Sequence, residues 1–274
     1  MIVAFSGWND AGDAASAALT FIGESLGAER FARLDPEEFY DFQATRPHIG
    51  FTDEGKREVT WPEIEIFAAR VPRAPRDLIL VQGPEPSTRW KTFCQNIVDL
   101  AEALGTQLVV SMGALLADVP HTLPVSITGL ASDATLVEKL ALKETTYEGP
   151  TGIVGVLHTA CMEAGLPAAS LWAAVPHYVA AAPNPKAALA LVRKVESLVA
   201  VTVDATQLEA ATEEYERQVG LAVQSDPDVQ RFVERLEQAA ERDTTPLGPG
   251  DLPSGDVIAS EFQRFLRQQA PPDR

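Results

Sequence analysis

Two aspartates stand in the glycine-bearing turn of SGWNDAGDAASAAL (residues 6–19), which directly follows a short apolar run. Gly7 and Gly12 have the spacing of a Walker phosphate-binding loop, which also needs a lysine and a hydroxyl after its last glycine. An aspartate and an alanine occupy those two positions, and the aspartates would repel phosphate. We therefore expect Asp10 or Asp13 to cap the following helix and to compensate its dipole, so that this stretch is a structural corner and not a nucleotide loop.

The stretch GPEPSTRW (residues 83–90) brings a carboxylate, a guanidinium and a large ring into one loop that two prolines stiffen. Its chemistry-bearing side chains are Glu85, Arg89 and Trp90. One interpretation is a helix start with an internal ion pair and a buried Trp90. The other is a ligand site, because exposed ion pairs add little stability and loops at strand ends commonly bind ligands. The sequence leaves both interpretations open.

Histidines stand in two further loops, DVPHT and PHYV. His121 and His177 could each serve as a base, a metal ligand or a structural donor, and Asp118 precedes the first of them in its loop. Ser111, in VVSMG, is expected at the end of a strand, where it could donate to an anion. No HExxH, CxxC or GxSxG motif accompanies these residues, so the sequence predicts no catalytic residue, no metal ligand and no cofactor.

Alternating apolar runs and helical patterns must position these side chains. The expected strands are residues 2–5, 77–81, 107–110 and 170–175, and the helices that follow three of them are residues 10–26, 89–104 and 186–200. This alternation predicts an α/β fold, with a mostly parallel or mixed sheet flanked by helices. In such sheets ligands bind beyond the carboxyl ends of the strands. The candidate pocket residues are Asp10, Glu85, Arg89, Trp90, Ser111, Asp118, His121 and His177.

Two parts of the chain depart from this alternation. Residues 39–70 alternate polar and apolar positions around a DEG turn, which predicts an antiparallel excursion. After residue 203 only helical patterns follow, at residues 205–223, 226–242 and 256–268. We therefore predict an α/β domain at residues 1–203 and an acidic α-helical C-terminal region at residues 204–274, the latter with 15 acidic and 7 basic residues.

Charge and composition restrict the classes of binding partner and the cellular compartment that we expect for this protein. The 274 residues carry a formal net charge of −17, which disfavours nucleic acid and anionic membranes as partners. No apolar run reaches the roughly 18 residues of a membrane span. Cys94 and Cys161 lie far apart in helical patterns, which predicts buried free thiols in a reducing compartment. We expect a cytoplasmic protein.

Five motifs follow one another along residues 2–200: GWNDAGDAA, GPEPSTRW, DVPHTLPVSITG, YEGPTGIVGVLH and SLWAAVPHYVAAAPNPKAALAL. Together they resemble the proteasome assembly chaperone 2 family, in its actinobacterial branch. The resemblance implies an α/β body similar to the nucleoside phosphorylase/hydrolase-like fold, and it implies a homotrimer. It implies no particular reaction. Leu123 stands where close relatives are expected to have arginine, and the final APPDR lacks the tyrosine of the tails with which docking chaperones engage a proteasome ring.

We therefore expect a non-catalytic protein-interaction or assembly-chaperone-like protein. The alternative is a small-ligand-binding protein, or a hydrolase- or phosphorylase-like enzyme, that uses a pocket at the carboxyl ends of the strands. Fold analogy is the sole support for a nucleoside-like ligand in that alternative.

Overall fold

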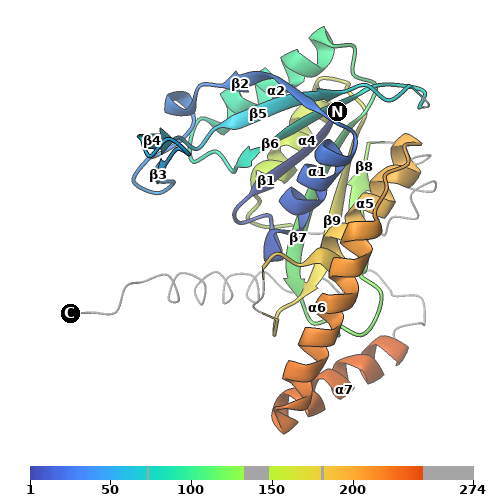
Figure 1. Cartoon of the computed structure of the whole chain (residues 1–274). Coiled ribbons are helices and arrows are strands. Elements are labelled where there is room, and N and C mark those ends of the chain that lie inside the picture. Colours follow the sequence, from blue (N-terminus) through green and yellow to red (C-terminus); the bar gives the residue numbers. More distant parts are fainter. Residues whose placement is uncertain (73, 133–147, 180–181, 243–274) are drawn as a thin grey trace.

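The computed structural model describes residues 1–72, 74–132, 148–179 and 182–242, and these residues build a seven-stranded mixed sheet flanked by helices (Figure 1). The strand order is β2-β5-β6-β1-β7-β9-β8. Strands β6, β1, β7 and β9 are mutually parallel, whereas β2, β5 and β8 join through antiparallel pairings. The strands are β1 (Ile2–Ser6), β2 (Glu29–Leu34), β5 (Ile64–Ala69), β6 (Leu78–Pro84), β7 (Val109–Ala117), β8 (Ile127–Ala131) and β9 (Ala168–Pro176). The predicted α/β fold class is confirmed.

Helices cover both faces of this sheet and bury two apolar cores. Helices α1 (Ala14–Ser25) and α5 (Pro185–Val199) share a core with one face, and α2 (Trp90–Ala103) and α4 (Ile153–Glu163) share a core with the other. Strand β1 contributes to both cores, because its successive side chains point to opposite faces and both faces are covered. Its residues Ile2–Phe5 are fully buried, as the unbroken apolar run predicts.

Strand β7 is longer than the sequence pattern indicates. It continues to Ala117 and pairs with β9 along its whole length, from Val109 opposite Ala168 to Ala117 opposite Pro176. The expectation that Ser111 ends a strand is therefore wrong. Ser111 is the third residue of β7, it is buried, and its hydroxyl lies 3.4 Å from the Ala169 carbonyl oxygen.

The predicted antiparallel excursion contains a separate hairpin, β3 (His48–Phe51) and β4 (Arg57–Thr60), followed by β5 of the main sheet. The sequence pattern does not predict strands β2 and β8. Both are edge strands and only partly buried, so they lack a continuous apolar run.

Two helices follow the sheet. Helix α6 (Thr206–Gln224) packs along α5, and α7 (Pro227–Arg242) packs on α6. Figure 1 shows this pair beyond the end of the body at which β7 terminates. The helix expected at residues 256–268 lies outside the described residues, and the predicted division at residue 203 stays a prediction. Cys94 and Cys161 are buried and free, as expected.

Candidate functional site

The opening loop is a corner built around a buried carboxylate. Asp10 is 4% exposed, and it accepts hydrogen bonds from the Ala15 N–H at 2.6 Å and from the backbone N–H and hydroxyl of Ser16. Burial raises the pKa of Asp10, and the hydrogen bonds from Ser16 and Ala15 oppose that rise. Gly12 has a φ of +61°, which the tight turn requires. Asp10 therefore caps α1, as the sequence predicts.

Glu85 is held at the start of a different helix. Its Oε1 atom accepts hydrogen bonds from the Asn9 amide nitrogen and from the Ile153 N–H, each at 2.7 Å. Ile153 is the first residue of α4, so the carboxylate lies at the positive end of that helix. Burial raises the pKa of Glu85, and these two hydrogen bonds oppose the rise. Through these two hydrogen bonds, Glu85 links the end of β6 to the loop that precedes α1 and to the start of α4.

Asn9 is a site residue that the sequence reasoning missed. It is 1% exposed, and its backbone carbonyl accepts the Ala114 N–H of β7 at 2.8 Å. Its side-chain Oδ1 is buried without a hydrogen-bond partner. The glycine preceding α4 explains how it fits, because a Cβ on Gly152 would lie 2.3 Å from the Asn9 amide nitrogen. Gly152 therefore makes room for the Asn9 side chain.

Arg89 and Trp90 do not join Glu85. Arg89 forms an ion pair with Glu38, and both side chains are half exposed. Trp90 is partly buried against the core between the sheet and α2, and its indole N–H donates to the Pro86 carbonyl. The expected internal ion pair of this loop is absent from the described contacts of Glu85. The structural interpretation of Trp90 fits this packing better than an open ligand site.

The remaining candidates lie in a second cluster, at the carboxyl ends of β7 and β9. His121 is 6% exposed, and both its backbone N–H and its Nδ1 atom lie 2.7 Å from the Tyr178 hydroxyl. Its carbonyl accepts a hydrogen bond from the Lys186 ammonium at 2.5 Å, and that ammonium also pairs with Glu216 of α6 at 2.6 Å. Burial and the nearby Lys186 lower the pKa of His121, which favours the neutral imidazole.

His177 and Asp118 meet across the same strand ends. The His177 Nδ1 atom lies 2.9 Å from the Asp118 carboxylate, which is largely exposed. The His177 ring also contacts Phe232 of α7 edge to face, with ring centroids 5.4 Å apart, and Phe232 contacts Tyr178 at 5.8 Å. A histidine beside a carboxylate can move a proton, but the His177 ring also packs against α7.

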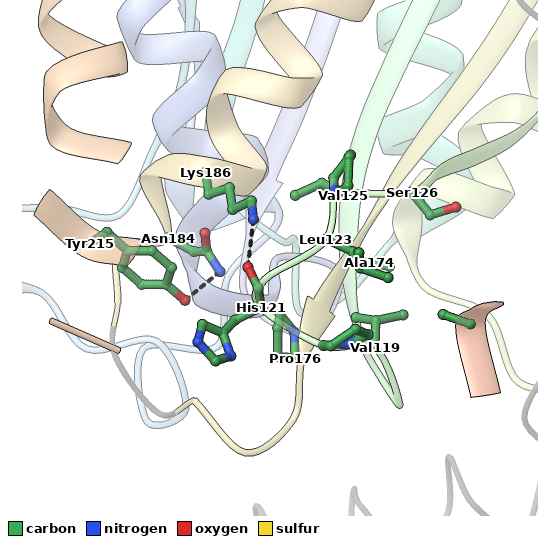
Figure 2. Close-up of a pocket in the computed structure, with 13 residues that line it drawn as sticks. Val119, His121, Leu123, Val125, Ser126, Ala174, Pro176, Asn184, Lys186 and Tyr215 are labelled. Atoms are coloured by element: carbon green, nitrogen blue, oxygen red, sulfur yellow. Dashed lines mark hydrogen bonds between the residues drawn. The ribbon is translucent and has the colours of Figure 1, made fainter. Parts of the chain in front are cut away.

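A small cavity opens beside this second cluster (Figure 2). Its volume is about 150 Å³ and its lining is mostly apolar. Figure 2 shows the Lys186 ammonium directed at the His121 carbonyl and the Asn184 amide directed at the Tyr215 hydroxyl. These four polar groups therefore already have partners. The lining residues are Val119, Pro120, His121, Leu123, Pro124, Val125, Ser126, Ala174, Pro176, Asn184, Lys186, Tyr215 and Ala240.

The predicted pocket residues thus separate into two clusters, and Arg89, Trp90 and Ser111 belong to neither. The first joins Asp10, Asn9 and Glu85 to the starts of α1 and α4. The second joins the ends of β7 and β9 to α5, α6 and α7. The opening loop touches both, because the Asn184 N–H donates to the Gly12 carbonyl at 2.7 Å.

The part of the chain that the structure describes contains no group of three or more His, Cys, Asp or Glu side chains placed to hold a metal ion. Within the same residues, none of the helices combines the length and the apolar character needed to cross a membrane.

The fold and the site define an α/β protein in which two carboxylates that follow strands accept hydrogen bonds from the protein's own helices. Asp10 accepts from the start of α1, and Glu85 accepts from the start of α4. Residues 4–223 match the PAC2 family, and the chain belongs to that family. The match continues past residue 203 into α6. No protein of curated function matches the sequence significantly.

Solved structures agree with this assignment. A PAC2 family protein from Streptomyces avermitilis is 48% identical, with a TM-score of 0.79 over 85% of this chain and 98% of that chain. The Mycobacterium tuberculosis proteasome-assembly chaperone homologue Rv2125 is 44% identical, with a TM-score of 0.78 over the same shares of the two chains. The fold is also similar to that of the Pyrococcus furiosus proteasome activator PbaB, which is 18% identical with a TM-score of 0.66 over 81% of this chain and 92% of that chain.

Proposed function

We propose that this chain is a non-catalytic, assembly-chaperone-like protein that acts by binding other proteins, and that proteasome subunits are its partners. The observation that carries the proposal is the 44% identity, over 85% of this chain, to a mycobacterial proteasome-assembly chaperone homologue. Family membership over residues 4–223 supports it.

The two clusters support the same proposal. A catalytic carboxylate or base needs free access to a reacting group. Glu85 instead accepts from Asn9 and Ile153, and Asp10 accepts from the start of α1. The ammonium of Lys186 is engaged by a carbonyl and a carboxylate. These groups are arranged to position helices.

Assembly kinetics test the proposal directly. Purified actinobacterial proteasome α and β subunits would be mixed with and without the chain, and particle formation followed by native gel electrophoresis. We expect the chain to change the rate of assembly and to co-migrate with an intermediate. An unrelated protein of similar size and charge is the control. Unchanged assembly over a tenfold range of stoichiometry, with no co-migration, would contradict the proposal.

We further propose that the chain acts as a homotrimer in the cytoplasm. Light scattering coupled to gel filtration should give about three times 29.5 kDa at micromolar concentration. A mass of 29.5 kDa across that range would contradict the trimer.

The cavity beside His121 favours one other candidate function, the binding of a small ligand at the strand ends. Its volume of about 150 Å³ is below the roughly 300 Å³ at which ligand pockets usually begin, so a nucleoside is too large for it as it stands. Thermal melts with adenosine, uridine and inorganic phosphate decide between the two functions. The assembly proposal predicts no saturable rise in melting temperature, whereas the ligand-binding candidate predicts one.

A further inference from the structure

The β3–β4 hairpin has one apolar face and one polar face. Ile49 lies opposite Val59 in the register, and Phe51 lies opposite Arg57. Directly opposed residues share a face, so these four side chains lie together. Trp61 directly follows β4, and its half-exposed ring contacts Phe42, with ring centroids 4.8 Å apart. We call this set, Ile49, Phe51, Arg57, Val59 and Trp61, the hairpin face. The alternate positions carry His48, Gly50, Glu58 and Thr60.

The hairpin face is exposed although it is apolar. Ile49 is 51% exposed, Phe51 75%, Val59 44% and Trp61 46%. Together they present apolar surface on the order of 400 Å², a patch size that on monomers often marks an interaction site. The hairpin forms its own two-stranded sheet, and an isolated pair of strands is marginal in water. Figure 1 shows it at the side of the body, away from α6 and α7.

Charge indicates which partner fits. The chain carries −17, so two copies repel each other over most of their surface. Residues 46–61 carry three basic and three acidic side chains and are neutral. Among the described residues, Arg57 on the hairpin face and Asp53 in its turn form no ion pair with each other or with a neighbour, whereas Lys56 and Glu54 pair at 2.7 Å. When two copies meet at this neutral apolar patch, the unpaired Arg57 of one copy can pair with the unpaired Asp53 at the patch or its edge on the other copy.

We infer that the hairpin face binds a second copy of this chain. The inference rests on the proposed homo-oligomer and names the surface that holds it. A standard interface buries about 800 Å² per partner, so the hairpin face supplies the apolar centre and the polar residues around it supply the rim.

Adjacent residues of β4 provide the test and its control. Val59→Asp places a carboxylate in the hairpin face, and Thr60→Asp places the same carboxylate on the polar face of the same strand. Both side chains are exposed and both residues are β-branched. Phe51→Ser is the second variant, because it removes apolar surface without adding charge. Circular dichroism and thermal melts establish that each variant is folded, and light scattering gives its mass.

We expect the wild type and Thr60→Asp to remain oligomeric, while Val59→Asp and Phe51→Ser dissociate toward 29.5 kDa. Folded variants that all keep the wild-type mass would overturn the inference and leave the proposed trimer standing. A wild type that is itself monomeric would overturn both. If Val59→Asp keeps its mass but no longer changes proteasome assembly, the hairpin face binds a different protein and the inference is wrong.

Discussion

The Glu85 carboxylate accepts one hydrogen bond from the Asn9 amide and one from the first N–H of α4. Replacing Glu85 with alanine leaves both donors without that acceptor. Each unsatisfied buried donor costs about 1–3 kcal/mol, so we expect Glu85→Ala to lower the free energy of unfolding by about 2–4 kcal/mol. Glu85→Gln keeps an acceptor oxygen in place and should cost within about 1 kcal/mol. Urea denaturation measures both, and equal losses would show that the two hydrogen bonds do not carry the effect.

The same residue makes stability depend on pH. Burial raises the pKa of Glu85 above its ordinary value of 4.5 in the folded protein. Because the folded state binds the proton more tightly than the unfolded chain, this contribution to stability is complete below the ordinary pKa. It is lost as the pH rises through the raised value. Glutamine does not titrate, so the unfolding free energy of Glu85→Gln, relative to the wild type, should increase from about pH 4 to about pH 7. A constant difference across that range would contradict this assignment.

Sequence reasoning found the chemistry-bearing residues but not their partners. Position after a strand placed Glu85 and His121 at the correct edge of the sheet, because parallel strands all end there. It could not show that Glu85 reaches the start of α4, which lies 68 positions later in the chain. Asn9 carries no motif, and its role depends on the space that Gly152 leaves. Long-range contacts of this kind follow from packing and not from local pattern.

At the scale of elements, two glycines in or beside helices have opposite expected effects. Alanine at position 152 would place its Cβ 2.3 Å from the Asn9 amide nitrogen, so the loop or α4 must shift. We expect Gly152→Ala to cost about 1–3 kcal/mol. Gly220 lies inside α6, and a Cβ there would meet nothing within 4 Å. We expect Gly220→Ala to stabilise the protein by about 0.5–1 kcal/mol, because alanine has the higher helix propensity. Thermal and urea melts that show the same sign for both would contradict this account.

Trp90 begins α2 and packs on the core below its loop. Its removal takes away apolar contacts and leaves the Pro86 carbonyl without the indole N–H. Because the ring is partly buried, Trp90→Ala should cost about 2–3 kcal/mol, below the 3–5 kcal/mol typical of full burial. Lys91→Ala, at the next and exposed position, is the control and should change stability by less than about 0.5 kcal/mol. An unchanged denaturation midpoint for Trp90→Ala would favour the open ligand site instead.

Element types could be predicted where the burial pattern is strong. The four parallel strands are buried on both faces and therefore appear as apolar runs, and Asn184 with Pro185 marks the start of α5. The edge strands β2 and β8 are partly exposed and carry no such run. The sequence pattern ends β7 too early, at residue 110, because the glycine and small residues that follow resemble a loop. Gly113 is instead buried in β7, opposite Trp172 of β9 in the register.

At the scale of the whole molecule, helices α6 and α7 contact the α/β body through both polar and apolar side chains. The Asn184 amide donates to the Tyr215 hydroxyl at 2.9 Å, and Lys186 pairs with Glu216. A small apolar cluster then forms between α6, α7 and the segment after β9, and it includes Tyr178, Tyr215 and Val233. Of the strand ends that the sequence predicts as ligand-binding, those of β7 and β9 are therefore the ones near which α6 and α7 pack.

Phe232 is the residue of α7 whose ring contacts both His177 and Tyr178. These two contacts lie at the junction between α7 and the strand ends, so Phe232→Ala should loosen α7 while the sheet and its two cores stay intact. Loss of about 1.4 kcal/mol of local stability corresponds to tenfold faster amide exchange, and two aromatic contacts make a loss of that order the expected one. Hydrogen exchange with mass spectrometry should therefore show about tenfold faster exchange in α7 and unchanged exchange in β1 and β7. Leu221→Ala, at a 55% exposed position of α6, is the control and should leave both regions unchanged. Faster exchange throughout the sheet would show instead that α7 is part of one cooperative unit with the body.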